Sequence, residues 1–295
     1  MMKNHNTAVF VEGRYFCEAP RWHHGRFWFS DFFAHEVCSA GLDGEVRVEA
    51  SFGDEQPSGL GWLPNGDLLV VGMTRREVLR VDAAGTHTTH ANLRQIATFH
   101  TNDMLVASDG SAYVGNFGFD LDHAFETLGV EGLIGASMTD PTPFVAKLAH
   151  ITPEGVASVA AADLLFPNGM ALLDGGRTLV VAETIAFQLT AFDRAADGSL
   201  SNRRPWASLR ELGVAPDGIC ADDDGGIWVA AAVGPKAVRV EEGGRVTDTV
   251  TTSNVAYACA LGGPDGRHLL VCTAPSSHSA EATANRAGRL ELVEL

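Results

Sequence analysis

The sequence is short of basic residues. It contains 21 Lys and Arg against 37 Asp and Glu, which gives a formal net charge of −16 at pH 7. Nucleic-acid binding depends on a basic patch that neutralises phosphate groups, and no such patch stands out along the chain. We therefore expect no nucleic-acid partner, and we expect the excess acid on a solvated surface.

Long apolar runs and targeting signals are also missing. No stretch approaches the roughly 18 apolar residues of a membrane-spanning helix, so no membrane partner is expected. Segment 1–7 is polar and lacks the apolar core of a secretory signal. The five cysteines are odd in number and have no metal or redox spacing. These features favour a cytoplasmic protein with reduced thiols.

Two catalytic motifs are absent from the chain. There is no Gly-rich phosphate loop that opens a helix, and there is no Gly-x-Ser-x-Gly nucleophile elbow. A hydrophobic content of 45% is enough for a sizeable core. No linker or break in composition divides the sequence, so residues 1–295 are expected to form a single domain.

What the sequence does contain is a repeated hairpin pattern. A turn built on glycine is followed by a short apolar strand six times, with about 41 to 65 residues between successive turns. Self-similarity at this period predicts an all-β, six-bladed β-propeller. Segments 7–11 and 288–295 are predicted strands that close the ring. The turns are His24-Gly25, Asn65-Gly66, Asp109-Gly110, Asp174-Gly175-Gly176, Asp224-Gly225-Gly226 and Asp265-Gly266.

Polar residues recur at one place in this repeat. The innermost strand of each propeller blade lies along the central channel, so equivalent positions at the strand starts converge on the axis. The position seven or eight residues before the turn glycine carries a carboxylate or amide in four of the six copies, and the next residue is usually small, which fits crowding between blades. The six positions are Glu18, Ser58, Asn102, Asn168, Asp217 and Ala258.

The convergent oxygens indicate a central metal site. Two carboxylates held close together would repel each other, and one would have to take up a proton. A divalent cation removes that conflict. The all-oxygen set of Glu18, Asn102, Asn168 and Asp217 suits calcium first, with magnesium and manganese as alternatives. Zinc is a further alternative, although it more usually recruits His or Cys.

Four segments carry a family resemblance. They resemble, in order, the signature segments of the SMP-30/gluconolactonase/LRE (regucalcin-like) family. The resemblance implies a six-bladed propeller with one divalent metal in its channel and lactone hydrolysis as the typical activity. It also implies that Glu18, Asn168 and Asp217 match metal ligands and that Asn102 matches a residue contacting metal or substrate. The segments are Glu18-Ala-Pro-Arg-Trp, Asn102-Asp103, Phe166-Pro-Asn-Gly169 and Ala215-Pro-Asp-Gly-Ile219.

The candidate catalytic residues follow from this set. Asp217 is the expected base that activates water, or in a covalent variant the nucleophile, and the sequence leaves both roles open. His100 lies two residues before Asn102 on the same face of an extended strand and is a second candidate base. Family members acting on sugar lactones typically have arginine at the matching position, so His100 puts a sugar-acid lactone in doubt. Asp120 and Ser58 are further candidate substrate contacts.

The strand pattern lapses between residues 117 and 144. This segment is rich in apolar residues, so we expect a lid loop over the metal, with packing against another subunit as the rival interpretation. The leading hypothesis is a metal-dependent lactonase acting on a small lactone, less polar than a sugar lactone. The alternatives are a phosphotriesterase-like hydrolase and a non-catalytic calcium-binding propeller. The sequence leaves the oligomeric state open.

Overall fold

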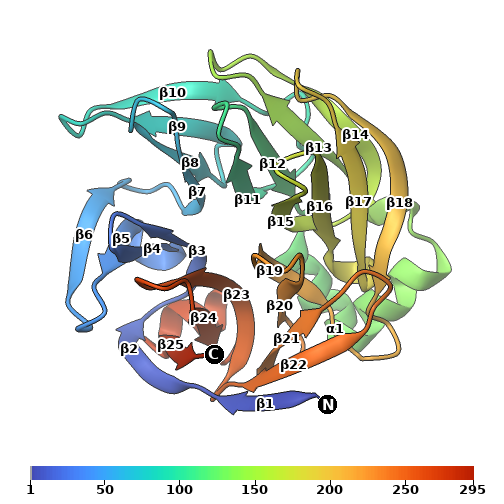
Figure 1. Ribbon diagram of the computed structural model, residues 1–295. Coiled ribbons are helices and arrows are strands. Elements are labelled where there is room, and N and C mark those ends of the chain that lie inside the picture. The colour runs from blue at the N-terminus through green and yellow to red at the C-terminus, as the bar shows by residue number, and fades with distance from the viewer. Residues whose placement is uncertain (1) are drawn as a thin grey trace.

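The chain forms a ring of six β-sheets in a computed structural model, which describes residues 2–295 (Figure 1). Five sheets have four strands and one has five. In each sheet the strand order follows the chain outward from the axis, except where the N-terminal strands join. The predicted six-bladed β-propeller is therefore confirmed.

The first three blades use only consecutive strands. From the axis outward they are β3 (Cys17–His23), β4 (Arg26–Asp31), β5 (Glu36–Ala40) and β6 (Val46–Ser51); β7 (Pro57–Trp62), β8 (Leu68–Gly72), β9 (Glu77–Val81) and β10 (His87–Asn92); and β11 (Thr101–Val106), β12 (Ala112–Asn116), β13 (Val145–Ile151) and β14 (Ala157–Leu165).

The last two blades take in the N-terminal strands. Blades four to six are β15 (Pro167–Leu173), β16 (Thr178–Glu183), β17 (Gln188–Arg194) and β18 (Leu200–Ser208); β19 (Pro216–Ala221), β20 (Ile227–Ala231), β21 (Lys236–Val240), β22 (Val246–Thr251) and β1 (Lys3–Asn6); and β23 (Val255–Gly262), β24 (His268–Ala274), β25 (Gly288–Glu294) and β2 (Ala8–Arg14).

The ring is closed by pairing between the two ends of the chain. Strand β2 lies antiparallel to β25, with Ala8 opposite Leu292. This confirms the predicted closing strands. Strand β1 was not predicted, and it lies parallel to β22, with Lys3 opposite Asp248. A contact across so many residues leaves no local signal in the sequence.

The core lies between neighbouring blades. Each blade is covered on both faces, so its strands read as continuous apolar runs instead of alternating ones. In β16, for example, Val180 packs into the cluster shared with blade five, which contains Ile227. Its neighbours Leu179 and Val181 pack into the cluster shared with blade three, which contains Tyr113.

The prediction of an irregular loop over 117–144 is wrong in its local structure. Most of the segment is helix α1 (Leu121–Thr139), capped by Asp120, whose carboxylate accepts a 3.0 Å hydrogen bond from the His123 N–H. Gly129 has non-helical angles (φ 67°, ψ 174°) and kinks the helix. Three glycines and few buried positions hide the helical period in the sequence.

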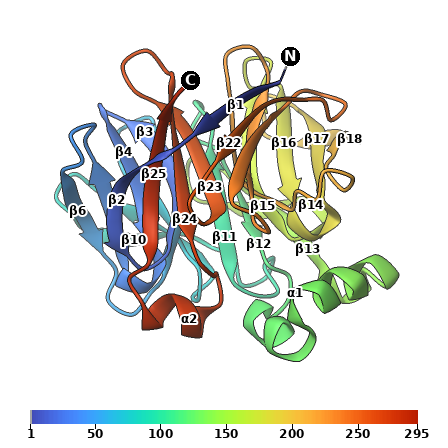
Figure 2. The ribbon, with the colours of Figure 1, turned by 90° about the horizontal axis from the view of Figure 1, so that it is seen from below.

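Helices gather at one end of the ring (Figure 2). Helix α1 follows β12, whose Asn116 pairs with Thr101 at the start of β11. Helix α2 (Ser279–Ala284) follows β24, whose Ala274 pairs with Val255 at the start of β23. Both helices therefore lie at the end where the inner strands begin. The remaining helical elements are the 3-10 turns η1 (Phe32–Ala34), η2 (Thr142–Phe144) and η3 (Thr184–Ala186).

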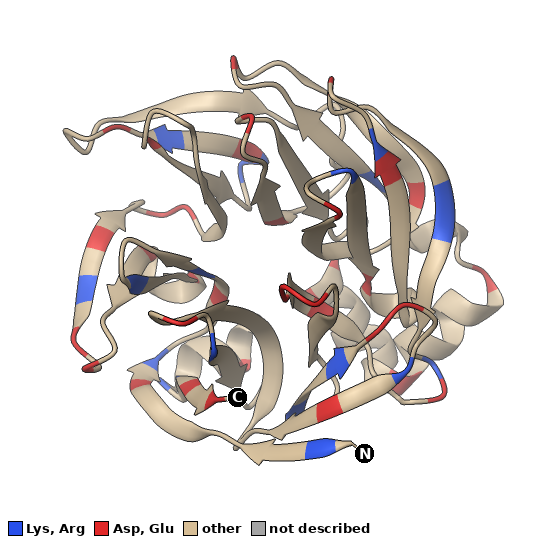
Figure 3. Cartoon of the chain, in the orientation of Figure 1, with Lys and Arg blue, Asp and Glu red and all other residues tan. Residues whose placement is uncertain are grey.

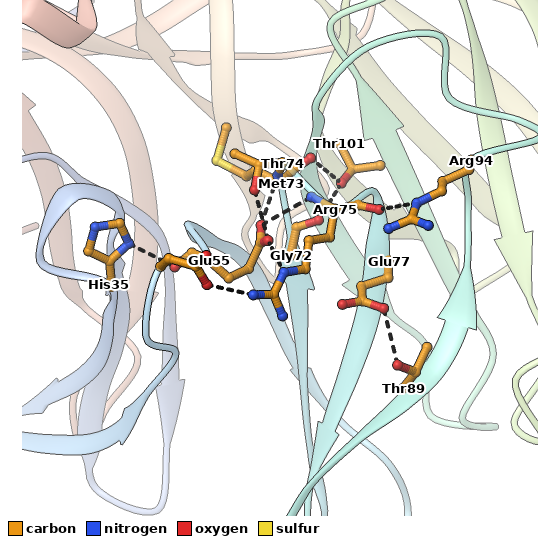
Figure 4. A network of polar contacts seen from close by, with 11 residues as sticks. His35, Glu55, Gly72, Met73, Thr74, Arg75, Glu77, Thr89, Arg94 and Thr101 are labelled. Atoms are coloured by element: carbon orange, nitrogen blue, oxygen red, sulfur yellow. Dashed lines mark hydrogen bonds and ion pairs between the residues drawn. The ribbon is translucent and has the colours of Figure 1, made fainter.

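A buried carboxylate holds the connections of blade two at this end (Figure 4). Glu55 is 1% exposed and accepts 2.8 Å hydrogen bonds from both the backbone N–H and the hydroxyl of Thr74. The Arg75 guanidinium lies 3.3 Å from the same carboxylate. Because Glu55 and Thr74 flank Gln56 and Met73, this network fixes two residues that line the pocket described below.

Acidic side chains outnumber basic ones around the ring (Figure 3). Among residues 2–295, no helix combines the length and the apolar character needed to cross a membrane.

Candidate functional site

The predicted polar positions lie at equivalent places in the inner strands. Ser58, Asn102, Asn168 and Asp217 are each the second residue of their strand, as is Glu18 in blade one. In every inner strand one extra residue interrupts the pairing with the second strand just beyond the start. A bulge of this kind turns side chains out of the regular alternation. Here it directs the polar groups toward the channel mouth.

Small residues beside these positions allow the blades to approach closely. A Cβ atom on Gly169 would lie 2.4 Å from the Asp217 carbonyl oxygen, and one on Gly218 would lie 2.6 Å from the Ala258 Cβ. The backbone of blade four therefore touches that of blade five directly behind the polar groups. This confirms the crowding predicted from the sequence.

The two amides are joined directly. The Asn102 Nδ2 donates a 2.8 Å hydrogen bond to the Asn168 Oδ1, and the Asn168 Nδ2 donates to the Thr184 hydroxyl at 3.2 Å. Both amides are buried. The Ser58 hydroxyl donates to the Asn102 Oδ1 at 3.4 Å and does not line the pocket, so it lies behind Asn102.

Burial and neighbouring negative charge disfavour ionisation of both carboxylates in the set. Burial raises the pKa of Glu18, and the charges of Asp217 and Asp103 raise it further. Burial also raises the pKa of Asp217, with Asp103 adding to the effect and a hydrogen bond with Asn168 opposing it. Each acid is disfavoured in its charged form, as expected for carboxylates forced together away from water.

The third acid of this cluster is neutralised by the protein itself. Asp103 accepts a 2.9 Å hydrogen bond from the Arg21 guanidinium, which also donates to the Met104 carbonyl at 2.6 Å. Arg21 therefore pairs with Asp103 and not with Glu18. Glu18 and Asp217 are left without a basic partner among residues 2–295.

The donor set fits a hard divalent cation. Two carboxylates and two amides supply only oxygen ligands, which calcium and magnesium prefer. A bound cation would favour the charged forms of Glu18 and Asp217 and so lower their raised pKa values. Within residues 2–295, no group of three or more His, Cys, Asp or Glu side chains is placed to hold a metal ion, so the candidate site depends on amide as well as carboxylate oxygens.

The four side chains open into one pocket of about 1050 Å³. Glu18, Asn102, Asn168 and Asp217 all contribute to its wall, although their strands come from four different blades. The four residues therefore share one cavity, and their role as ligands of one ion stays a prediction. The pocket also contains both remaining polar candidates, His100 and Asp120.

His100 sits in an aromatic environment. Its ring stacks on Phe99 with 4.2 Å between centroids, and Phe117 lies 6.2 Å away. Burial lowers the pKa of His100, with the charge of Asp120 opposing the shift. A neutral imidazole at neutral pH follows, which is the form that can accept a proton.

Two segments cover the pocket from different blades. Helix α1 extends from blade three, and α2 extends from blade six. They meet where the Ser279 N–H donates a 3.3 Å hydrogen bond to the Asp122 carboxylate, and where His278 lies 4.0 Å from Glu126. Residues from both helices line the pocket, so together they form its roof.

The sequence did not identify every residue at the pocket. In blade six it placed Ala258 at the convergent position, yet Ala258 is buried in the core while the preceding residue, Tyr257, lines the pocket. The pairing shifts between Ala256 and Ala258, so Tyr257 is the extra residue. Thr184, which accepts from Asn168, was missed because hydroxyl residues at strand ends are common.

The fold and site together define a class of protein: a six-bladed β-propeller whose channel mouth carries two buried carboxylates and two buried amides. The chain belongs to the SMP-30/gluconolactonase/LRE-like family, whose model matches residues 16–275. The predicted family membership is confirmed.

Individual relatives match shorter stretches. Regucalcin of Danio rerio is 30% identical over 122 residues, which are 40% of this chain and 41% of that protein. L-arabinolactonase of Azospirillum brasilense is 29% identical over 137 residues, 46% of this chain and 44% of that protein. The matches thus span less than half the length of these relatives.

Whole-chain likeness is found among solved structures. Regucalcin of Agrobacterium tumefaciens, described as a calcium-binding protein, superposes with a TM-score of 0.77 over 100% of this chain and 96% of that chain, at 18% identity. At this level of identity, the likeness shows the fold.

Proposed function

We propose that the protein is a divalent-metal-dependent lactonase, which opens the ester of a small lactone by hydrolysis. One observation carries the proposal: Glu18 and Asp217 meet two amides in a single pocket, with the pKa of both acids raised and no basic partner among the described residues. Membership of the family and the similarity to an L-arabinolactonase favour lactone hydrolysis over other reactions.

Glu18, Asn102, Asn168 and Asp217 would hold the ion, with calcium favoured because all four donors are oxygens. The similarity to regucalcin, a calcium-binding protein in one solved structure, supports the same choice. When bound, the ion supplies Lewis-acid polarisation of the ester carbonyl.

The side chains of the protein then transfer one proton. In ring opening, water adds to the carbonyl carbon, the ring C–O bond breaks, and the proton lost by water goes to the leaving alkoxide. Asp217 takes this proton in our proposal, or attacks the carbonyl carbon itself in a covalent variant. His100 is the alternative base, since burial keeps it neutral. Asn102 and Asp120 hold substrate oxygens, and Ser58 positions Asn102.

We further propose that the lactone is less polar than a sugar lactone, because aromatic rings surround His100. A reducing compartment such as the cytoplasm is proposed from the cysteines: all five are free, and four of them are buried.

A lactone panel tests the proposal. Purified protein is expected to release acid from sugar, aliphatic or aryl lactones, measured by pH-stat, and a chelator should stop the reaction. Asp217→Asn should abolish turnover while elemental analysis still finds the ion. Metal binding without turnover on any lactone would contradict the proposal and favour a non-catalytic propeller. Turnover on phosphotriesters alone would favour the phosphotriesterase-like alternative.

A further inference from the structure

The pocket has two chemically different parts. Its polar part is the acid-and-amide set, and most of the rest is apolar. The roof helix α1 contributes Phe125, Val130, Leu133 and Ile134 to the lining. Val130 is 48% exposed and lines the pocket, so it leaves apolar surface uncovered there.

Residues outside α1, which we call the aromatic wall, continue this apolar surface. Phe32 and Phe33 come from blade one, Phe99 and Phe117 flank His100, and Val233 is 42% exposed. Pockets of about 300 to 1000 Å³ hold drug-sized ligands. A cavity of about 1050 Å³ is thus far larger than the ring of a small lactone requires.

The pocket lining is rich in acidic side chains. Of the described residues that line it, none is Lys or Arg. Six are carboxylates, and two of these, Glu18 and Asp217, belong to the proposed ion site, where a divalent cation would neutralise them. The other four belong to α1, its N-cap and α2, and no Lys or Arg forms an ion pair with them among the described residues: Asp120, Asp122, Glu126 and Glu281.

The contacts of these roof acids are local. Asp120 caps α1, Asp122 accepts the Ser279 N–H, and Glu126 lies 4.0 Å from His278. None of these contacts involves a Lys or Arg side chain. A negatively charged substituent that lies beside the roof, and not at the proposed ion, would therefore meet like charges with no Lys or Arg of the lining to hold it.

We propose that the substrate is a lactone bearing an uncharged, apolar substituent of several carbon atoms, which lies between α1 and the aromatic wall, and that anionic lactones are excluded. This rests on the proposed lactonase function and names its substrate class. Ile134 of α1 is a specificity-determining residue. The same charges favour departure of the product, because ring opening turns a neutral ester into a carboxylate.

Three γ-lactones that share one ring test the inference. They carry a pentyl, a hydroxymethyl or a carboxylate group on the γ-carbon. Each fully buried methylene is worth about fourfold in affinity, so kcat/KM for the pentyl lactone should exceed that for the hydroxymethyl lactone by roughly tenfold or more even with partial burial. The carboxylate lactone should be the slowest.

A pair of variants on α1 locates the effect. Ile134 lines the pocket, whereas Met138 lies on the same helix, is 56% exposed and does not line it. Ile134→Ser should reduce the preference for the pentyl over the hydroxymethyl lactone by about fourfold, mainly through a higher KM for the pentyl lactone. Met138→Ser should behave as wild type. Equal effects of the two variants would overturn the assignment.

The matching γ-lactams separate this inference from the function it rests on, because an amide ring binds without being opened. Calorimetry should give the same order of affinity: pentyl, hydroxymethyl, then carboxylate. Lactones opened in the reverse order, or lactams bound in that order, would refute the substrate class. Tight binding of the pentyl lactam with no lactone opened would instead refute the hydrolase and support the apolar subsite.

Discussion

The change Asp217→Asn should stabilise the ion-free protein at neutral pH while it removes activity. Burial and the charge of Asp103 raise the pKa of Asp217 in the folded state. A carboxyl group with a raised pKa contributes its full stabilisation at pH values below its pKa in the unfolded chain, which is about 4. That stabilisation is lost as the pH rises through the pKa of the same group in the folded protein. Ion-free wild-type protein should therefore lose stability as the pH rises from about 4 toward neutrality.

The size of the effect follows from what the amide changes. It removes the charge but keeps an oxygen beside Asn168, whose hydrogen bond opposes the raised pKa of Asp217. Each pKa unit corresponds to about 1.4 kcal/mol. Relief of a buried, repelled carboxylate is expected to add about 1 to 3 kcal/mol to the free energy of unfolding at neutral pH. For a chain of this size, Tm should rise by roughly 2 to 6 °C.

Thermal unfolding after chelator treatment measures this, between about pH 4 and about pH 8. The two proteins should have similar Tm values at the acid end, and Asp217→Asn should be the more stable at the neutral end. Added calcium should reverse the order, because the wild-type carboxylate binds the ion more tightly than the amide does, and a more tightly bound ion stabilises the fold more. Asp54→Asn is a control, since that side chain is 89% exposed. A variant less stable than ion-free wild type at neutral pH would refute the reasoning.

Two further predictions concern the scaffold. Glu55→Ala leaves the Thr74 N–H and the Arg75 guanidinium without their buried acceptor, so the free energy of unfolding should fall by about 3 kcal/mol, whereas Asp54→Ala should leave Tm unchanged. Gly169→Ala places a Cβ against the backbone of Asp217, so the calcium affinity measured by calorimetry should fall by about tenfold or more. As a control, Gly135→Ala adds a Cβ that meets no atom within 4 Å, and this variant should bind calcium as wild type does.

The repeat explains why much of the site was predictable. Six blades share one geometry, so a position counted back from each turn glycine reaches the same place in space. Asn102 and Asn168 are 66 residues apart and hydrogen-bonded. The position in the repeat alone did not distinguish side chains that enter the pocket from side chains behind it. Ser58 occupies the same position as the others, yet its hydroxyl donates to Asn102. The direction of a side chain after a bulge depends on backbone angles that composition does not reveal.

The failures share a physical cause. Blade six has its extra residue one position earlier than the simple count assumes, which exchanges Ala258 for Tyr257 at the pocket. Helix α1 has a weak apolar stripe because its inner face lines a cavity instead of packing against a sheet. In both places the structure departs from regular periodicity, and pattern reasoning has no other signal to use.

One part of the site is determined by the propeller fold, and another part can vary without changing the fold. The proposed ion-binding residues lie on inner strands whose neighbouring residues, such as Gly169, have no room for a side chain. The roof consists of insertions, α1 after β12 and α2 after β24, that join each other through contacts such as Ser279 to Asp122. Insertions on a propeller can change without disturbing the ring. In the function proposed here, the residues for the reaction therefore come from the blades, and the residues that select the lactone come from the roof.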